Sequence, residues 1–190
     1  MDLILKEIRR KEEKEMKRAI LMIVCLCLMC TAAFAEETIE LKWEEIGTEE
    51  VAAQGEFQAL EIPNVCTVNF WIPSVLNAVD TSVIEGQFKP TALYTTEDDT
   101  YGVAIFVNEI GSLEEYVSLM ETQAGGSNFR NVTVNGVDCI GYEVAENDME
   151  CLIYPVTENI IVTFSCTPLN GDEDWDLTKG AIFASIQPGQ

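Results

Sequence analysis

Four strands in succession are predicted by residues 131–166, which read NVTVNGVDCIGYEVAENDMECLIYPVTENIIVTFSC. Asn135-Gly136 is the dipeptide best suited to a two-residue type I′ turn, so it predicts a hairpin between strands 131–134 and 137–144. Strands 149–156 and 160–166 follow, because apolar and β-branched residues dominate both. The stretch therefore predicts an antiparallel meander.

The register of the last hairpin decides whether Cys151 and Cys166 meet. If Glu158 and Asn159 alone form the turn, the two cysteines face each other and a cross-strand disulfide is within reach. If Thr157 also belongs to the loop, one face becomes strongly apolar, comprising Leu152, Tyr154, Val162, Phe164 and Cys166. The cleaner pattern favours the second register, with Asn159 in the left-handed conformation. The cysteines are then mostly buried small side chains, and a disulfide remains an open alternative.

Two helices flank the meander. Ser112 stands three residues before Glu115, the arrangement of a capping box, and it predicts a helix that Gly125-Gly126 ends. An acidic first turn opens a second helix, which we expect to run from Asp172 to about Ser185. The inward stripes are Leu113, Tyr116, Val117 and Met120 in the first, and Leu177, Ala181, Ile182 and Ile186 in the second.

The segment before the first helix predicts two hairpins and a short helix. Strands are expected at 57–62, 66–72, 92–95 and 101–109, with a helical turn at 75–79 as one interpretation of an ambiguous segment. Thr48 is placed to cap a short helix that runs through Ala53. The elements together predict an α+β fold, an antiparallel β-sheet with helices packed on its faces, in a single domain of residues 36–190.

The first 35 residues read as a leader and signal peptide. Lys17-Arg18 precedes an uncharged run, and Ala33-Phe34-Ala35 supplies the small residues of a cleavage site. We therefore expect export and cleavage after Ala35, with Met16 as the alternative true start. A retained membrane anchor is the competing interpretation, although the uncharged run of 17 residues is shorter than the roughly 20 of a spanning helix.

The charge of the exported part restricts its partners. Of the 33 acidic and 11 basic residues, 5 and 7 precede residue 36, which leaves 28 against 4 and a net charge near −24. Such a field disfavours nucleic acid and anionic lipid, while cations and basic surfaces stay compatible with it. We expect a soluble monomer without stable membrane insertion after cleavage. Since histidine is absent, no nucleophile has an imidazole base.

Asp172, Asp174 and Asp176 are candidate metal ligands, because they alternate as calcium-loop ligands do. Leu177 stands where that loop needs glycine, and Phe183 where it needs glutamate. Helix capping explains the same acids without an ion. Calcium is the one candidate cofactor that the sequence suggests.

Trp71, Tyr94 and Tyr101 are candidates for a surface that binds a glycan or peptide. Trp71 lies on the face of its strand opposite Phe70, where the pattern turns polar. Packing beneath a helix is the competing interpretation, because aromatic side chains supply much of the burial in a small domain.

Several phrases in residues 57–187 resemble the PsbP-like family, which includes exported bacterial PsbP- and DcrB-like proteins. They are VNFWIP at 68–73, SLEEY at 112–116, VNGV at 134–137, Gly141-Tyr142 and Ala184-Ser185-Ile186. The resemblance implies an α/β sandwich that acts as a non-enzymatic binding or assembly module. It supplies no catalytic residues.

We therefore expect an exported, non-enzymatic binding or assembly module, at the cell surface or outside the cell, with an unidentified protein or glycan partner. One alternative is a carboxylate-dependent hydrolase of glycans or peptidoglycan, which needs two acids facing each other across a cleft. A second alternative is a calcium-responsive adhesion module built on the three aspartates.

Overall fold

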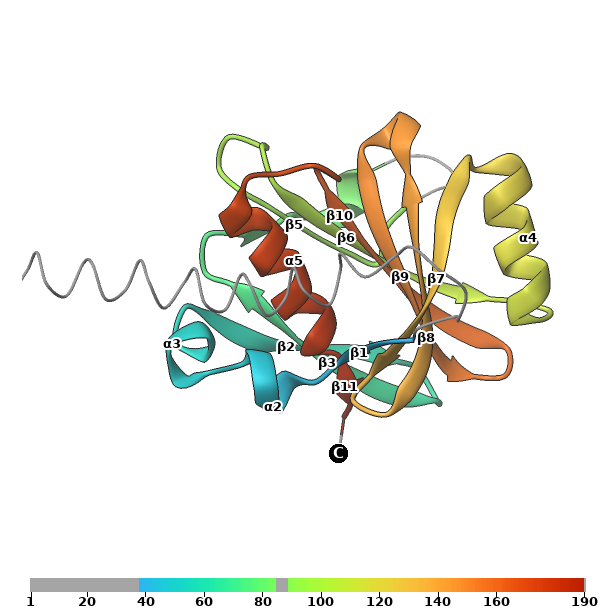
Figure 1. Cartoon of the computed structure of the whole chain (residues 1–190), viewed down its shortest axis with the longest axis horizontal. Coiled ribbons are helices and arrows are strands. Elements are labelled where there is room, and N and C mark those ends of the chain that lie inside the picture. Colours follow the sequence, from blue (N-terminus) through green and yellow to red (C-terminus); the bar gives the residue numbers. More distant parts are fainter. Residues whose placement is uncertain (1–37, 85–88, 190) are drawn as a thin grey trace, which may run out of the picture. The chain divides into compact units, whose positions relative to one another are not determined.

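The computed structural model describes residues 38–84 and 89–189 (Figure 1). The predicted signal peptide and its cleavage site at Ala35 lie outside the described residues. The largest element is an eight-stranded sheet whose neighbours are antiparallel, apart from a parallel pairing of its first two strands in space. In spatial order they are β1 (Ile39–Leu41), β7 (Gly126–Val134), β8 (Val137–Val144), β9 (Met149–Thr157), β10 (Ile160–Thr167), β6 (Gly102–Glu109), β5 (Ala92–Thr95) and β4 (Asn77–Ala78).

The meander predicted from 131–166 is confirmed, because β7 to β10 are neighbours in chain order. At its first turn Asn135 has a φ of 48° and Gly136 a φ of 84°, the two positive values that a type I′ turn requires. The helical turn expected at 75–79 is wrong: the short strand β4 lies there and pairs with β5. The parallel edge strand β1 was not predicted, since three residues are too few for an alternating pattern.

The side chain of Asn135 connects this turn to both ends of the described chain. Its Oδ1 accepts a hydrogen bond from the Trp43 N–H at 3.0 Å. Its Nδ2 donates to the carbonyls of Ala184 at 2.8 Å and Ile186 at 2.9 Å. The backbone N–H of Asn135 also donates to the Leu41 carbonyl at 2.9 Å. One turn residue therefore holds the segment after β1 and the last residues of the C-terminal helix.

A second sheet, which the sequence did not separate from the first, packs across the core. It consists of β11 (Gln187–Pro188), β3 (Cys66–Pro73) and β2 (Gly55–Ile62), all antiparallel. The inward face of β3 meets the large sheet, where the rings of Phe70 and Phe164 pack edge to face with centroids 5.3 Å apart. The expected fold class holds, with the hairpin of β2 and β3 forming a separate layer (Figure 1).

Helices cover both faces of the large sheet, as predicted (Figure 1). Helix α4 (Leu113–Gln123) begins at Ser112, whose Oγ accepts from the Glu115 N–H at 3.2 Å. Helix α5 (Glu173–Ala184) begins at Asp172, whose Oδ1 accepts from the Trp175 N–H at 2.8 Å. Shorter elements are α2 (Trp43–Ile46), which was not predicted, α3 (Glu49–Ala52), which Thr48 caps as predicted, and the 3₁₀ turns η1 (Thr81–Val83) and η2 (Ala145–Asn147).

Two apolar clusters form, one on each face of the large sheet. The larger lies between that sheet, the small sheet and α5, and includes Phe70, Phe164 and Ile182. The smaller lies under α4, whose predicted stripe packs on the buried residues Tyr142, Val144, Cys151, Ile153 and Ile161. Within the described ranges, no helix has both the length and the apolar composition of a membrane span.

Candidate functional site

The three candidate aromatic residues do not form one exposed surface. Trp71 is only 3% exposed, because α2 places Trp43 over it with ring centroids 5.9 Å apart. Tyr94 packs edge to face against Phe70, and Tyr101 stacks on Trp175 at 4.8 Å. The expectation of a shared ligand surface is therefore wrong. The face of β3 that carries Trp71 is polar at Thr67 and Asn69, but the unpredicted helix α2 covers the tryptophan itself.

Trp71 is nevertheless unusual as a buried residue. Its indole Nε1–H has no hydrogen-bond partner among the described residues. A Cβ added to Gly55 would stand 2.6 Å from that nitrogen, so the indole N–H lies directly over the first residue of β2. Burying an unpaired donor costs about 1–3 kcal/mol, which apolar packing around the ring has to offset.

The three aspartates of the predicted calcium site have separate partners. Asp172 caps α5, and its Oδ2 also accepts a hydrogen bond from the Tyr101 hydroxyl at 3.0 Å. Asp176 pairs with the Lys179 ammonium at 3.0 Å, and Asp174 is exposed on the first turn. In the part of the chain that the structure describes, no three acidic or cysteine side chains are placed to hold a metal. The competing explanation, helix capping, accounts for the observed geometry.

The cysteine pair Cys151–Cys166 is not bonded, and all four cysteines after residue 35 are free thiols. Glu158 and Asn159 form a two-residue turn that pairs Thr157 with Ile160, as in the first register. A bulge then shifts the pairing, so that Cys151 faces Ser165 and Cys166 faces Glu150, as in the second. The two cysteines consequently lie on opposite faces of the sheet. Asn159 does not take the expected left-handed conformation.

A cluster of five charged side chains joins α5 to the large sheet. We call it the ion cluster; its members are Arg130, Glu143, Glu150, Asp176 and Lys179. The Arg130 guanidinium contacts Glu143 at 3.6 Å and also hydrogen bonds to Glu150. The Lys179 ammonium contacts Glu150 and Asp176, each at 3.0 Å, and donates to the Leu169 carbonyl at 2.6 Å.

The backbone of the sheet makes room for the ion cluster. Arg130 on β7 and Gly141 on β8 are register partners, and Glu143 on β8 faces Glu150 on β9. A Cβ on Gly141 would stand 3.2 to 3.3 Å from three atoms of the Arg130 side chain. The arginine therefore lies across the glycine to reach the third strand, and a larger residue at 141 would displace it.

Charge neutralisation dominates the chemistry of the ion cluster. Glu143 and Glu150 are part-buried acids on adjacent strands, the geometry that a two-carboxylate hydrolase would exploit. Both, however, are bonded to Arg130, and Glu150 is bonded to Lys179 as well. Burial alone would lower the pKa of Lys179, but Glu150 and Asp176 outweigh it and raise that pKa above its ordinary value. The arrangement fits a structural role, in which broken pairs would leave buried charges.

Sequence reasoning missed the ion cluster, although one signal was present. After residue 35 the chain has only four basic residues, and Arg130 and Lys179 are two of them. A lysine in the apolar half of a helix, 4% exposed in the structure, needs acidic partners. Nothing in the sequence indicates which of the 28 acids those partners are.

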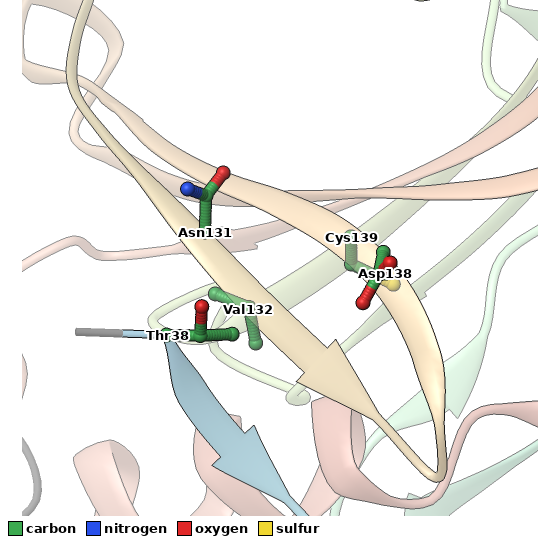
Figure 2. Close-up of a pocket in the computed structure, with 5 residues that line it drawn as sticks. All are labelled: Thr38, Asn131, Val132, Asp138 and Cys139. Atoms are coloured by element: carbon green, nitrogen blue, oxygen red, sulfur yellow. The ribbon is translucent and has the colours of Figure 1, made fainter. Parts of the chain in front are cut away.

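A surface pocket of about 290 Å³ lies beside β1, β7 and β8 (Figure 2). Its lining residues are Thr38, Asn131, Val132, Asp138 and Cys139. Among them, Cys139 carries a thiol, which is a potential nucleophile, but burial raises the pKa of this thiol to about 12. The thiol is therefore protonated at neutral pH and is a poor nucleophile.

Comparison with known proteins adds a likeness of fold. No family model and no curated protein matches the sequence. Among solved structures, the chain is similar to the solution structure of cyanobacterial PsbP (CyanoP) from Synechocystis sp. PCC 6803. The TM-score is 0.45 and the identity 12%, over 70% of this chain and 92% of that chain. At this level the likeness carries no residue role and no function, so membership of the PsbP-like family remains a prediction.

Proposed function

We propose that this protein is an exported, non-enzymatic binding or assembly module that acts at the cell surface or outside the cell. One observation carries the proposal: three of the four described basic residues, Lys42, Arg130 and Lys179, are engaged in ion pairs with acids of the same chain. The surface is left with a large excess of carboxylates, which is suited to attracting a cationic partner.

The same observation argues against the hydrolase alternative. A two-carboxylate hydrolase needs both acids open to a substrate that lies between them. The carboxylates of the facing acids Glu143 and Glu150 are instead engaged in ion pairs with Arg130 and Lys179. We therefore expect no turnover by this pair.

Turnover is tested with the full chain on chromogenic glycosides and on dye-labelled peptidoglycan. We expect no product above the level of a buffer control. The proposal fails if product forms and Glu150→Gln abolishes it while Glu146→Gln, a change at an exposed acid in η2, leaves it intact. That pattern would identify a catalytic carboxylate in the ion cluster.

Export is tested by sequencing the N-terminus of the protein recovered from outside the cytoplasm. We expect it to begin at Glu36, and to do so equally for a chain that starts at Met16. Ala35→Arg should block cleavage and keep the leader attached. Recovery of an uncleaved normal chain in the membrane would support the retained anchor instead.

A further inference from the structure

Strand β2 has a free edge that is long enough to accept another strand. It runs for 8 residues, and among the described strands it pairs only with β3. Its outward N–H and C=O groups are therefore unpaired by any described strand, and such an edge is a template for strand addition. The other edge of the small sheet, β11, spans only 2 residues and offers far less.

An exposed aromatic side chain stands on this edge strand. Phe57 is 45% exposed, and its ring packs edge to face on Trp43 at 5.4 Å. Phe57 and the buried Trp71 are register partners, so both lie on the outer face of the small sheet. Ala59, two residues further on the same face, is exposed as well. The outer face thus offers apolar contact beside free backbone groups.

Acidic residues surround this edge. Residues 38–73 contain seven glutamates and one basic residue, Lys42, which contacts Glu40 at 2.8 Å and Glu45 at 3.8 Å. Glu56 and Glu61 lie exposed on β2 itself, and α3, which packs against β2, adds Glu49 and Glu50. A second copy of this chain would bring the same charges to the edge and be repelled. A basic segment would be attracted, and its cations could approach the face of Phe57.

We propose that β2 is the docking edge of this module, and that its ligand is an extended basic segment of a partner protein, added as a further strand. The proposal rests on the proposed binding function and names the kind of partner. Main-chain hydrogen bonds to β2 supply affinity, Phe57 contacts alternate side chains, and the glutamates select for lysine and arginine.

The test uses a fluorescent peptide of alternating lysine and valine, about as long as β2, and the full chain. Fluorescence anisotropy measures its affinity. Two control peptides separate the contributions: alternating glutamate and valine reverses the charge, and alternating lysine and proline keeps the charge but removes half of the backbone donors. We expect binding of the lysine–valine peptide only, with affinity that falls as salt is added.

Variants of the chain locate the binding edge. Phe57→Ala should weaken binding about fivefold, through lost apolar and cation–π contact. Leu119→Ala, which removes a comparably exposed apolar residue of α4, should leave it unchanged. Glu61→Lys should weaken binding more than Glu146→Lys, which makes the same charge change on η2. Thermal unfolding of each variant checks that the fold is kept.

Several outcomes overturn the proposal. Equal binding of the lysine–proline peptide, or equal losses for Glu61→Lys and Glu146→Lys, would mean diffuse electrostatic attraction without strand addition. Absence of binding, or dimerisation of the full chain that Phe57→Ala abolishes, would also contradict it. None of these outcomes contradicts the proposed function. The proposed function has its own test and fails if the protein shows turnover that depends on Glu150.

Discussion

The two faces of the large sheet are covered in different ways. On one face α5 lies in the main core beside the small sheet, and six of its residues are buried: Trp175, Lys179, Ala181, Ile182, Phe183 and Ala184. On the other face α4 lies at the surface, and none of its 11 residues is buried. Its stripe is half covered, and Leu119 is 41% exposed.

The two helices also differ in how clearly their sequences show an amphipathic pattern. The regular stripe of α4 reflects a helix with one side in water, since only such a helix needs a sharp boundary between its faces. α5 is covered on several sides, so apolar residues occur around it and a buried lysine interrupts them. The clearer pattern in the sequence therefore belongs to the less buried helix.

Truncating an apolar side chain in each helix should show the greatest loss of stability in α5. Ile182 in α5 is fully buried, so Ile182→Ala should lower the free energy of unfolding by about 2–5 kcal/mol. Met120→Ala in α4 removes a half-buried side chain and should cost about 1 kcal/mol. Urea unfolding followed by circular dichroism measures both. Equal losses would remove the contrast between the two faces.

The ion cluster provides the next test. Lys179→Met leaves Arg130 as the single cation paired with the part-buried Glu150 carboxylate. The substitution should lower the free energy of unfolding by about 3 kcal/mol. Lys42→Met breaks exposed pairs and should cause no measurable change. Adding Glu150→Gln to Lys179→Met should recover part of the loss, which a double-mutant cycle detects. A fully additive pair would mean that the two side chains do not interact.

Alkaline pH should weaken the protein through its buried thiols. Burial raises the pKa of Cys139 from 9.0 to about 12. Its contribution is therefore complete below pH 9 and declines above it, because the unfolded chain loses the proton first. The slope is about 1.4 kcal/mol per pH unit until pH 12.

Cys139→Val should remove that share of the pH dependence, as measured by urea unfolding at pH 8 and pH 10. Cys166, on the same face, and Cys151, under α4, also have raised pKa values because of burial. Some alkaline dependence should therefore remain in the variant. If the variant and the normal chain lost stability at the same rate, the Cys139 thiol would not be responsible.

The smallest expected effect concerns the helix caps. Ser112→Ala removes one hydrogen bond at the start of α4 and should cost about 1 kcal/mol. Asp172→Ala removes the cap of α5 and also the acceptor of the Tyr101 hydroxyl, so about 1–2 kcal/mol is expected. Thermal unfolding of both variants shows which substitution causes the larger loss of stability. A larger loss for Ser112→Ala would contradict the deeper anchoring of α5.

Local signals allowed most of the elements to be predicted. The turn at Asn135-Gly136 and the caps at Thr48, Ser112 and Asp172 are encoded within a few residues, and all four are confirmed. The hairpin of β2 and β3 was also identified, with bounds close to those observed.

Features that depend on distant pairing could not be predicted in the same way. Trp71 is buried by Trp43, which lies 28 residues earlier in a helix too short to give a pattern. The partners of Lys179 come from other strands. The β9–β10 bulge makes each expected register correct at one end. Pro155, which faces Ile161 at the shift, is a residue type typical of bulges, but it was not used as a signal.

The bonds of Asn135 have a consequence for how the chain matures. They span 92 residues toward Trp43 and 49 toward Ala184, so the turn cannot be locked until the final helix has been synthesised. Closing such long loops is slow compared with forming the meander. A chain synthesised from its N-terminus can therefore form the bond from Asn135 to Trp43 before the bonds to Ala184 and Ile186, and all the contacts of this turn are complete only when the last residues are in place.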